Sequence, residues 1–301
     1  MKRSKGMIVA FIAPALILFL LVFIYPIIRT LIMSFYRVES VTAPVSEWTL
    51  TGFDNYVKLY NTELFRTSMW NLFRIWLIGG ALVMCLALLF AVILNSGIRF
   101  KRFFRAVIYL PNIISAVALA TMWLQYVYNQ RFGLLTTFFN WLGLERLAAT
   151  PWTDADHMFW ALLFAYCFGM VGYHMLIFSS GIEKIPVEYY EASTIDGAGK
   201  PRQFAHITWP LSKGVLKTNL TMWSITSVGF FIWSQLFSTV TASNQTITPM
   251  VYMHLQTFGA GNVVTERNAG LGAAVGVVMA LCVVIAFLIT NLAIKKDDFE
   301  Y

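Results

Sequence analysis

Charged residues are scarce in this chain of 301 residues: only 12% are Asp, Glu, Lys or Arg, while 58% are hydrophobic. Soluble domains carry roughly 25% charged residues, so this composition excludes an ordinary soluble fold. The apolar residues are gathered in long uncharged runs. A bilayer core about 30 Å thick needs roughly 20 such residues per helix. The sequence therefore predicts a polytopic, all-α membrane protein.

Cysteine is also rare, and Cys85, Cys167 and Cys282 each lie in a different apolar run. This distribution predicts neither a disulfide framework nor a metal cluster. The four His residues share no ligand spacing, and no pair of acidic residues lies within a span. A membrane-embedded hydrolase or transferase is therefore disfavoured, because it would need clustered carboxylate, His or nucleophilic side chains.

Nucleotide-binding motifs are missing as well. A Walker A loop ending at Gly199 and Lys200 would need Gly where Thr194 stands and Ser or Thr where Pro201 stands. A dinucleotide fingerprint would need a glycine where Arg202 stands. We therefore expect no cofactor on this chain and no enzyme activity of its own. An ATP-driven process would need another subunit.

The uncharged runs and their polar breaks predict six transmembrane helices within a single domain, residues 1–301. No charged residue occurs between 218 and 265, but this stretch far exceeds one span, and the polar segment 239–246 divides it. Short interfacial helices are expected near 133–141 and 249–258. The predicted spans are 7–35, 70–95, 106–127, 157–181, 215–238 and 269–294.

The net charge of +7 is interpreted as a topology signal, and no nucleic-acid partner is expected. Most of the 22 Lys and Arg residues lie in the N-terminal tail, at 99–105, at 184–217 and at 295–296. Cytoplasmic loops of membrane proteins carry such an excess of basic residues. Both termini, and the polar segment 182–213 between spans four and five, are therefore predicted to be cytoplasmic.

The polar segment 182–213 has the pattern of two helices around a glycine turn. Pro186 can begin the first helix, because its ring fixes φ and its missing N–H would have no helical partner there. Gly197 and Gly199 interrupt the pattern, and Pro201 can open the second helix. Such a protruding, rigid element could transmit motion from a soluble ATPase to membrane helices.

The spacing in this segment resembles the EAA loop of inner-membrane subunits of binding-protein-dependent ABC importers. The family pattern is Glu-Ala-Ala, three residues, Gly, nine residues, Ile, one residue, Leu-Pro. This chain keeps that spacing from Glu191 to Pro210, with Ser193 for the second Ala and Trp209 for Leu. Other segments also resemble the carbohydrate-uptake branch of the family, which includes maltose and glycerol-phosphate permeases: residues 14–36, 52–56, 104–111 and 185–186.

The resemblance implies a type I ABC importer permease fold in a bacterial inner (plasma) membrane. It implies ATP-driven uptake of sugars or oligosaccharides by alternating access. The implied partners are a second homologous permease in a heterodimer, two ATP-binding subunits that carry ATP and Mg²⁺, an extracytoplasmic solute-binding protein and the lipid bilayer. The residues expected to couple the chain to the ATPase are Glu188, Glu191, Ala192, Asp196, Gly197, Ala198 and Pro210.

Polar and aromatic side chains recur at helical spacing along the predicted fifth span. Such a face could stack against sugar rings, and related permeases line their central cavity with this part of the chain. Ordinary packing is the alternative, because aromatic residues are also common in membrane helices and at interfaces. His174, in the fourth span, is predicted to be a neutral, hydrogen-bonded packing residue. The candidate pathway residues are Asn219, Trp223, Thr226, Ser227, Phe230 and Trp233.

Two other transport functions remain open. One is an ABC importer for amino acids, polyamines or phosphate, which uptake assays with labelled substrates would separate from a sugar importer. The other is an ion-coupled secondary transporter, which should show intramembrane acidic residues or broken helices in inverted repeats. Persistence of uptake after ATP depletion would favour the secondary transporter.

Overall fold

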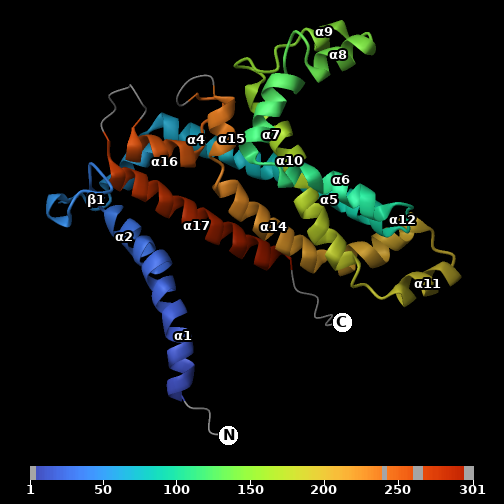
Figure 1. The fold of residues 1–301 in the computed structure, drawn as a ribbon, viewed down its shortest axis with the longest axis horizontal. Coiled ribbons are helices and arrows are strands. Elements are labelled where there is room, and N and C mark those ends of the chain that lie inside the picture. The colour runs from blue at the N-terminus through green and yellow to red at the C-terminus, as the bar shows by residue number, and fades with distance from the viewer. Residues whose placement is uncertain (1–4, 239–242, 260–266, 295–301) are drawn as a thin grey trace. The chain divides into compact units, whose positions relative to one another are not determined.

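The computed structural model describes residues 5–238, 243–259 and 267–294 (Figure 1). The basic residues predicted to mark the termini, Lys2, Arg3, Lys295 and Lys296, lie outside the described residues, as does part of the polar segment 239–246. The chain divides into two units, residues 1–66 with 249–281 and residues 67–248 with 282–301. Regular structure is almost entirely helical, as the composition predicts.

The first unit begins with one long helix, formed by α1 (Lys5–Phe19), a π-helical turn (Leu20–Ile24) and α2 (Tyr25–Met33). Pro14 lies inside α1 and Pro26 near the start of α2 without ending the helix, as membrane helices tolerate. The span Val9–Met33 has a mean hydropathy of 2.7, yet none of its most apolar window is buried within the chain. Its surface is left for lipid or for another subunit.

The rest of the first unit packs around a small core. Antiparallel strands β1 (Tyr36–Arg37) and β2 (Thr49–Leu50) pair Tyr36 with Leu50 and Arg37 with Thr49. Gly270 lets α17 (Ala269–Ala293) approach this ribbon, because a Cβ there would lie 1.8 Å from the Tyr36 carbonyl oxygen. The unit also contains a 3-10 turn (Val45–Glu47), α3 (Asp54–Asn61), the start of α4 (Glu63–Arg74) and α16 (Pro249–Phe258).

The second unit is built around α10 (Met158–Ile182), which packs against α5 (Gly80–Asn95) and α6 (Lys101–Ile113) (Figure 1). In α10, 67% of the most apolar window is buried. Gly172 allows this packing, because a Cβ there would lie 2.4 Å from the Ile108 carbonyl oxygen of α6. Other helices of the unit are the π-helical turns Ile75–Gly79 and Trp123–Val127, α7 (Ala116–Met122), α8 (Leu134–Trp141), α9 (Glu145–Ala148), α14 (Lys213–Val228) and α15 (Ile232–Phe237).

Four helices of the described residues are long and apolar enough to cross a membrane. They are Val9–Met33, Glu63–Asn95, Met158–Ile182 and Ala269–Ala293, and they correspond to the first, second, fourth and sixth predicted spans. The count rises to five if the bent pair Lys101–Ile113 and Ala116–Val127 forms one span. Short helices α8 and α16 lie where interfacial helices were expected.

The third predicted span, 106–127, is not one straight helix. Its two halves are bent by 98° at a break after Ile113. Ser115 produces the break, because its backbone is extended (φ −58°, ψ 144°) and its hydroxyl accepts a hydrogen bond from the Ala118 N–H. This is the N-cap that serine favours, and it starts α7 as a new helix.

The prediction of one uninterrupted helix over 215–238 was also wrong. Helix α14 ends at Val228, Gly229 follows as its C-cap, and α15 begins only at Ile232. The freed carbonyl of Phe230 accepts a hydrogen bond from the Thr248 hydroxyl at 2.5 Å. A segment distant in the sequence therefore stabilises the break.

Candidate functional site

Segment 182–213 folds as two helical pieces around a glycine turn, at the end of α10 opposite to α8 and α9 (Figure 1). Pro186 is the N-cap of α11 (Val187–Ile195). Gly197 has φ +78°, the left-handed region that glycine adopts most readily. Gly199 is the N-cap of α12 (Lys200–Gln203), with Pro201 in its first turn. The second piece continues through a π-helical turn (Phe204–Thr208) and α13 (Trp209–Leu211).

The two ends of this loop are held together by close helix packing. Gly181, in the last turn of α10, lies against Val215 in the first turn of α14. A Cβ on Gly181 would lie 2.2 Å from Val215 Cγ2, which is closer than any carbon contact can be. The loop therefore emerges from two helices that are in contact at its base.

A charged cluster ties the start of the loop to α6. Glu183 Oε1 accepts hydrogen bonds from Lys101 Nζ at 2.9 Å and from Arg105 at 2.5 Å. Lys101 Nζ also donates to Asn95 Oδ1 at 2.6 Å, at the end of α5. The hydrogen bonds from Lys101 and then Arg105 lower the pKa of the Glu183 carboxyl below its ordinary value of 4.5. Glu183 is thus an anionic anchor between the loop and two membrane helices.

The outer surface of the loop carries most of the residues predicted for coupling. Glu188, Glu191, Ala192, Asp196 and Gly197 are exposed, and Ala198 and Pro210 are partly buried. No heavy atom lies within 4 Å of where a Gly197 Cβ would stand. The glycine is therefore required by its backbone conformation, and not by crowding.

Ile195 is a surface feature that the sequence analysis did not single out. This apolar side chain is 88% exposed at the last position of α11, directly before the turn. Its position at the tip of the loop leaves this apolar side chain free to contact another protein. The sequence feature that could have identified Ile195 is its position as a single apolar residue among polar residues, directly before the glycine turn.

The candidate pathway residues of α14 and α15 are largely packed inside the second unit. Asn219, Trp223, Ser227, Phe230 and Trp233 are all buried. Only Thr226 is exposed among the six. The arrangement of these side chains favours the packing alternative for five of the six residues and leaves Thr226 on an open face.

Specific contacts explain this burial. Asn219 Oδ1 lies 2.7 Å from His174 Nδ1, and both side chains are fully buried, which fits the packing role predicted for His174. Trp223 donates from Nε1 to the Trp76 carbonyl oxygen at 2.8 Å. It lies over Gly80, where a Cβ would come within 2.6 Å of the indole nitrogen. Asn219 and Trp223 of α14 thus take part in tight helix packing.

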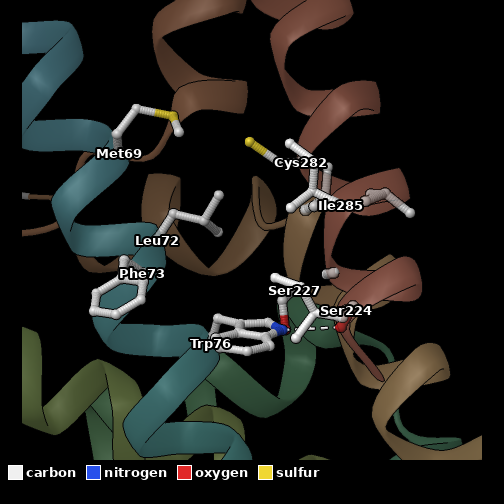
Figure 2. Close-up of a pocket in the computed structure, with 12 residues that line it drawn as sticks. Met69, Leu72, Phe73, Trp76, Ser224, Ser227, Cys282 and Ile285 are labelled. Carbon is white, nitrogen blue, oxygen red and sulfur yellow. Dashed lines mark hydrogen bonds between the residues drawn. The ribbon is translucent and has the colours of Figure 1, made fainter. Parts of the chain in front are cut away.

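An apolar cavity of about 230 Å³ lies between the α4 end of the second span, α14 and the C-terminal part of α17 (Figure 2). Ser224 Oγ accepts a hydrogen bond from Trp76 Nε1 at 2.9 Å at one edge of the cavity. Ser227 also lines it. The other lining residues are Met69, Leu72, Phe73, Val228, Cys282, Val283, Ile285, Ala286 and Ile289, so the cavity offers too few polar groups to bind a sugar.

Within the described residues, no group of three or more His, Cys, Asp or Glu side chains is placed to hold a metal ion. The loop is an exposed two-helix element, and its base contacts α5, α6, α10 and α14.

Comparison with known proteins agrees with this arrangement. Residues 83–296 match the family described as "binding-protein-dependent transport system inner membrane component". The chain is 30% identical over 286 residues to the arabinooligosaccharides transport system permease protein AraP of Bacillus subtilis (strain 168), covering 93% of this chain and 86% of that protein.

Solved structures share the fold. A bacterial ABC transporter involved in the import of the acidic polysaccharide alginate has a chain that aligns with a TM-score of 0.80 and 18% identity, covering 98% of this chain and 97% of that chain. A second structure of an alginate ABC transporter, in complex with an alginate pentasaccharide-bound periplasmic protein, aligns with a TM-score of 0.77. This chain is a multi-pass membrane protein that belongs to the family of binding-protein-dependent transport system inner membrane components.

Proposed function

We propose that this chain is a permease subunit of an ATP-driven importer for sugars or oligosaccharides, and that it moves substrate by alternating access. Family membership supports transport that depends on a binding protein. The substrate class is supported by the names of similar proteins, which concern arabinooligosaccharides and alginate. Amino acids, polyamines and phosphate are the alternative substrates.

The observation that carries the coupling proposal is the geometry of the loop between α10 and α14. Its tip presents Ile195 and Glu191 to solvent, while its base is fixed by Gly181 against Val215 and by Glu183 against α6. A groove on an ATPase could bind the apolar tip, and a basic side chain there could pair with Glu191. Movement of the tip would then act directly on membrane helices.

The proposed assembly contains a second, similar permease, two ATP-binding subunits and an extracytoplasmic solute-binding protein. ATP and Mg²⁺ are bound by the ATPase subunits, and this chain binds no cofactor. The loop and both termini face the cytoplasm, as the distribution of basic residues indicates. The open face of α14 that carries Thr226 is the proposed contribution of this helix to the substrate pathway.

Two substitutions in the loop test the coupling proposal in the complete importer reconstituted in proteoliposomes. Glu191→Lys reverses the charge offered to the ATPase, and Gly197→Pro forbids the left-handed backbone at φ +78°. Both variants should insert and fold normally but reduce oligosaccharide uptake by about tenfold or more, in line with the loss of a charge-assisted contact.

The matched control is Glu145→Lys, the same charge reversal at an exposed position of α9, near the other end of α10. It should leave oligosaccharide uptake unchanged. Normal uptake by the Glu191 and Gly197 variants at normal expression would contradict the coupling role. Uptake of labelled amino acid, polyamine or phosphate in place of oligosaccharide would instead contradict the substrate class.

A further inference from the structure

Gln203 is a buried polar residue in a loop that exposes much of its surface to solvent. It ends α12, and only 4% of it is exposed. Its amide nitrogen Nε2 lies 3.2 Å from the Tyr190 carbonyl oxygen, 3.0 Å from Ser193 Oγ and 2.9 Å from Thr194 Oγ1. All three acceptors belong to α11. The two hydrogens of one amide therefore join the second helix to the last turns of the first, across the Gly197 turn.

Ser193 stands where the family pattern has its second Ala. Its hydroxyl donates to the Tyr190 carbonyl oxygen at 2.9 Å and is thereby oriented to accept from Gln203. An Ala side chain could accept no such bond. At this departure from the pattern, the Ser193 hydroxyl pairs with Gln203.

The inner side of the loop has little packing to hold its shape. A cavity of about 340 Å³ lies between the loop and the end of α5, with Asn95, Lys200, Gln203 and Thr208 among its lining residues. On this side, a hydrogen bond of 3.0 Å between the Tyr190 and Thr208 hydroxyls is a second link between the two helical pieces. Hydrogen bonds therefore join α11 to the second helical piece at several points.

We propose that Gln203 is a positioning residue that, together with Ser193, fixes α11 and α12 relative to each other. A glycine turn alone leaves its flanking helices free to reorient, because glycine has access to many backbone conformations. Several hydrogen bonds from one side chain to three acceptors of α11 remove that freedom. A force applied to α11 then turns the loop as one body, and does not bend it at Gly197. This proposal rests on the proposed coupling function.

The test compares Gln203→Met, Ser193→Ala and the double variant in the complete importer in lipid nanodiscs. Methionine keeps the unbranched shape of glutamine and removes its hydrogen bonds. Hydrogen exchange of the α11 amides measures how firmly α11 is held against α12. The amount of substrate moved per ATP hydrolysed measures coupling. His206→Met, which introduces the same side chain at an exposed position of the adjoining helical turn, is the control.

Gln203→Met should speed exchange of the α11 amides about fivefold, as expected for the loss of roughly one net hydrogen bond, and lower the substrate moved per ATP by a similar factor. Ser193→Ala should have a smaller effect, and none in addition when Gln203 is already Met. The His206 variant should match the wild type in both measurements.

An unchanged exchange rate of the α11 amides in Gln203→Met would contradict the claim that Gln203 holds α11 against α12. Faster exchange with unchanged substrate per ATP would overturn the positioning role. Failure of the coupling function is distinguishable from both, because Glu191→Lys would then also transport normally while Gln203→Met still exchanged faster.

Discussion

At the scale of single residues, Glu183 differs from the other acidic residues of the loop because two cations neutralise it within the chain. Its partners Lys101 and Arg105 belong to a group of basic residues that the sequence analysis used only as a topology signal. A carboxylate whose pKa is lowered on folding stabilises the folded state above its ordinary pKa, and this stabilisation is lost as the pH falls through the lowered value.

Glu183→Gln should therefore lower the melting temperature at neutral pH by about 1–3 °C, a modest effect because all three side chains are about one-third or more exposed. The difference from the wild type should shrink as the pH falls below 4.5 and vanish once the pH is below the lowered pKa of Glu183, where the folded wild-type carboxylate also loses its charge. Thermal unfolding of the purified chain at a series of pH values measures this. Glu145→Gln, at a carboxylate that forms no salt bridge within the described residues, should be neutral throughout.

Individual residues of the candidate site were predictable only where a backbone rule identified them. Pro186, Gly197 and Pro201 act through φ alone, so their positions were evident from the sequence. Gln203 and Ile195 depend on which side of a short helix faces the loop interior, and short polar helices carry no periodicity that reveals it. Their roles required the folded structure.

At the scale of elements, the sequence predicted that the fold is helical with long apolar helices, and it did not predict the helix breaks. Hydrophobicity determines where a membrane helix can lie, but it is insensitive to a serine N-cap such as Ser115 or a glycine end such as Gly229. The break after α14 also depends on Thr248, which is distant in the sequence. The predicted six spans and the limits of the domain therefore stay predictions.

The exposed face of α14 gives a prediction at this scale. Cysteines introduced at Thr218 and Thr226, both exposed, should react with a water-soluble thiol reagent in the assembled importer if this face lines an aqueous pathway. Cysteines at Asn219 and Trp223, which are fully buried, should react at least tenfold more slowly, as expected of local opening that costs more than about 1.4 kcal/mol.

The labelling requires a background in which Cys85, Cys167 and Cys282 are replaced. Substrate should protect Thr226→Cys from the reagent. Equal reactivity at the buried and exposed positions, or no reactivity at Thr226→Cys, would contradict the assignment of this face to the pathway.

At the scale of the whole molecule, the long apolar helices differ widely in how far the chain itself buries them. The buried share of the most apolar window is 67% in Met158–Ile182, 39% in Glu63–Asn95, 22% in Ala269–Ala293 and zero in Val9–Met33. The apolar window of Val9–Met33, none of which is buried within the chain, either faces lipid on all sides or packs on another subunit. The proposed heterodimer would cover it.

A photo-crosslinking residue at Leu21, which is 61% exposed, should therefore give a covalent product with the second permease when both are expressed together. The same residue at Leu162 of α10, which is fully buried, should react only within the chain. Mass spectrometry of the products distinguishes these outcomes. Adducts of Leu21 with lipid alone in the active importer would contradict the packing of this helix on a partner.

The burial of α10 also bears on how the protein enters the membrane during synthesis. Its mean hydropathy is 1.8, against 2.7 to 2.9 for the other three long spans, so it is the least able to partition into lipid unaided. Its packing partners α5 and α6 are both synthesised before it. When α10 leaves the ribosome, the α6 surface against which Gly172 packs is already in the bilayer, whereas Val215 and Asn219 of α14, the partners of Gly181 and His174, are synthesised only afterwards.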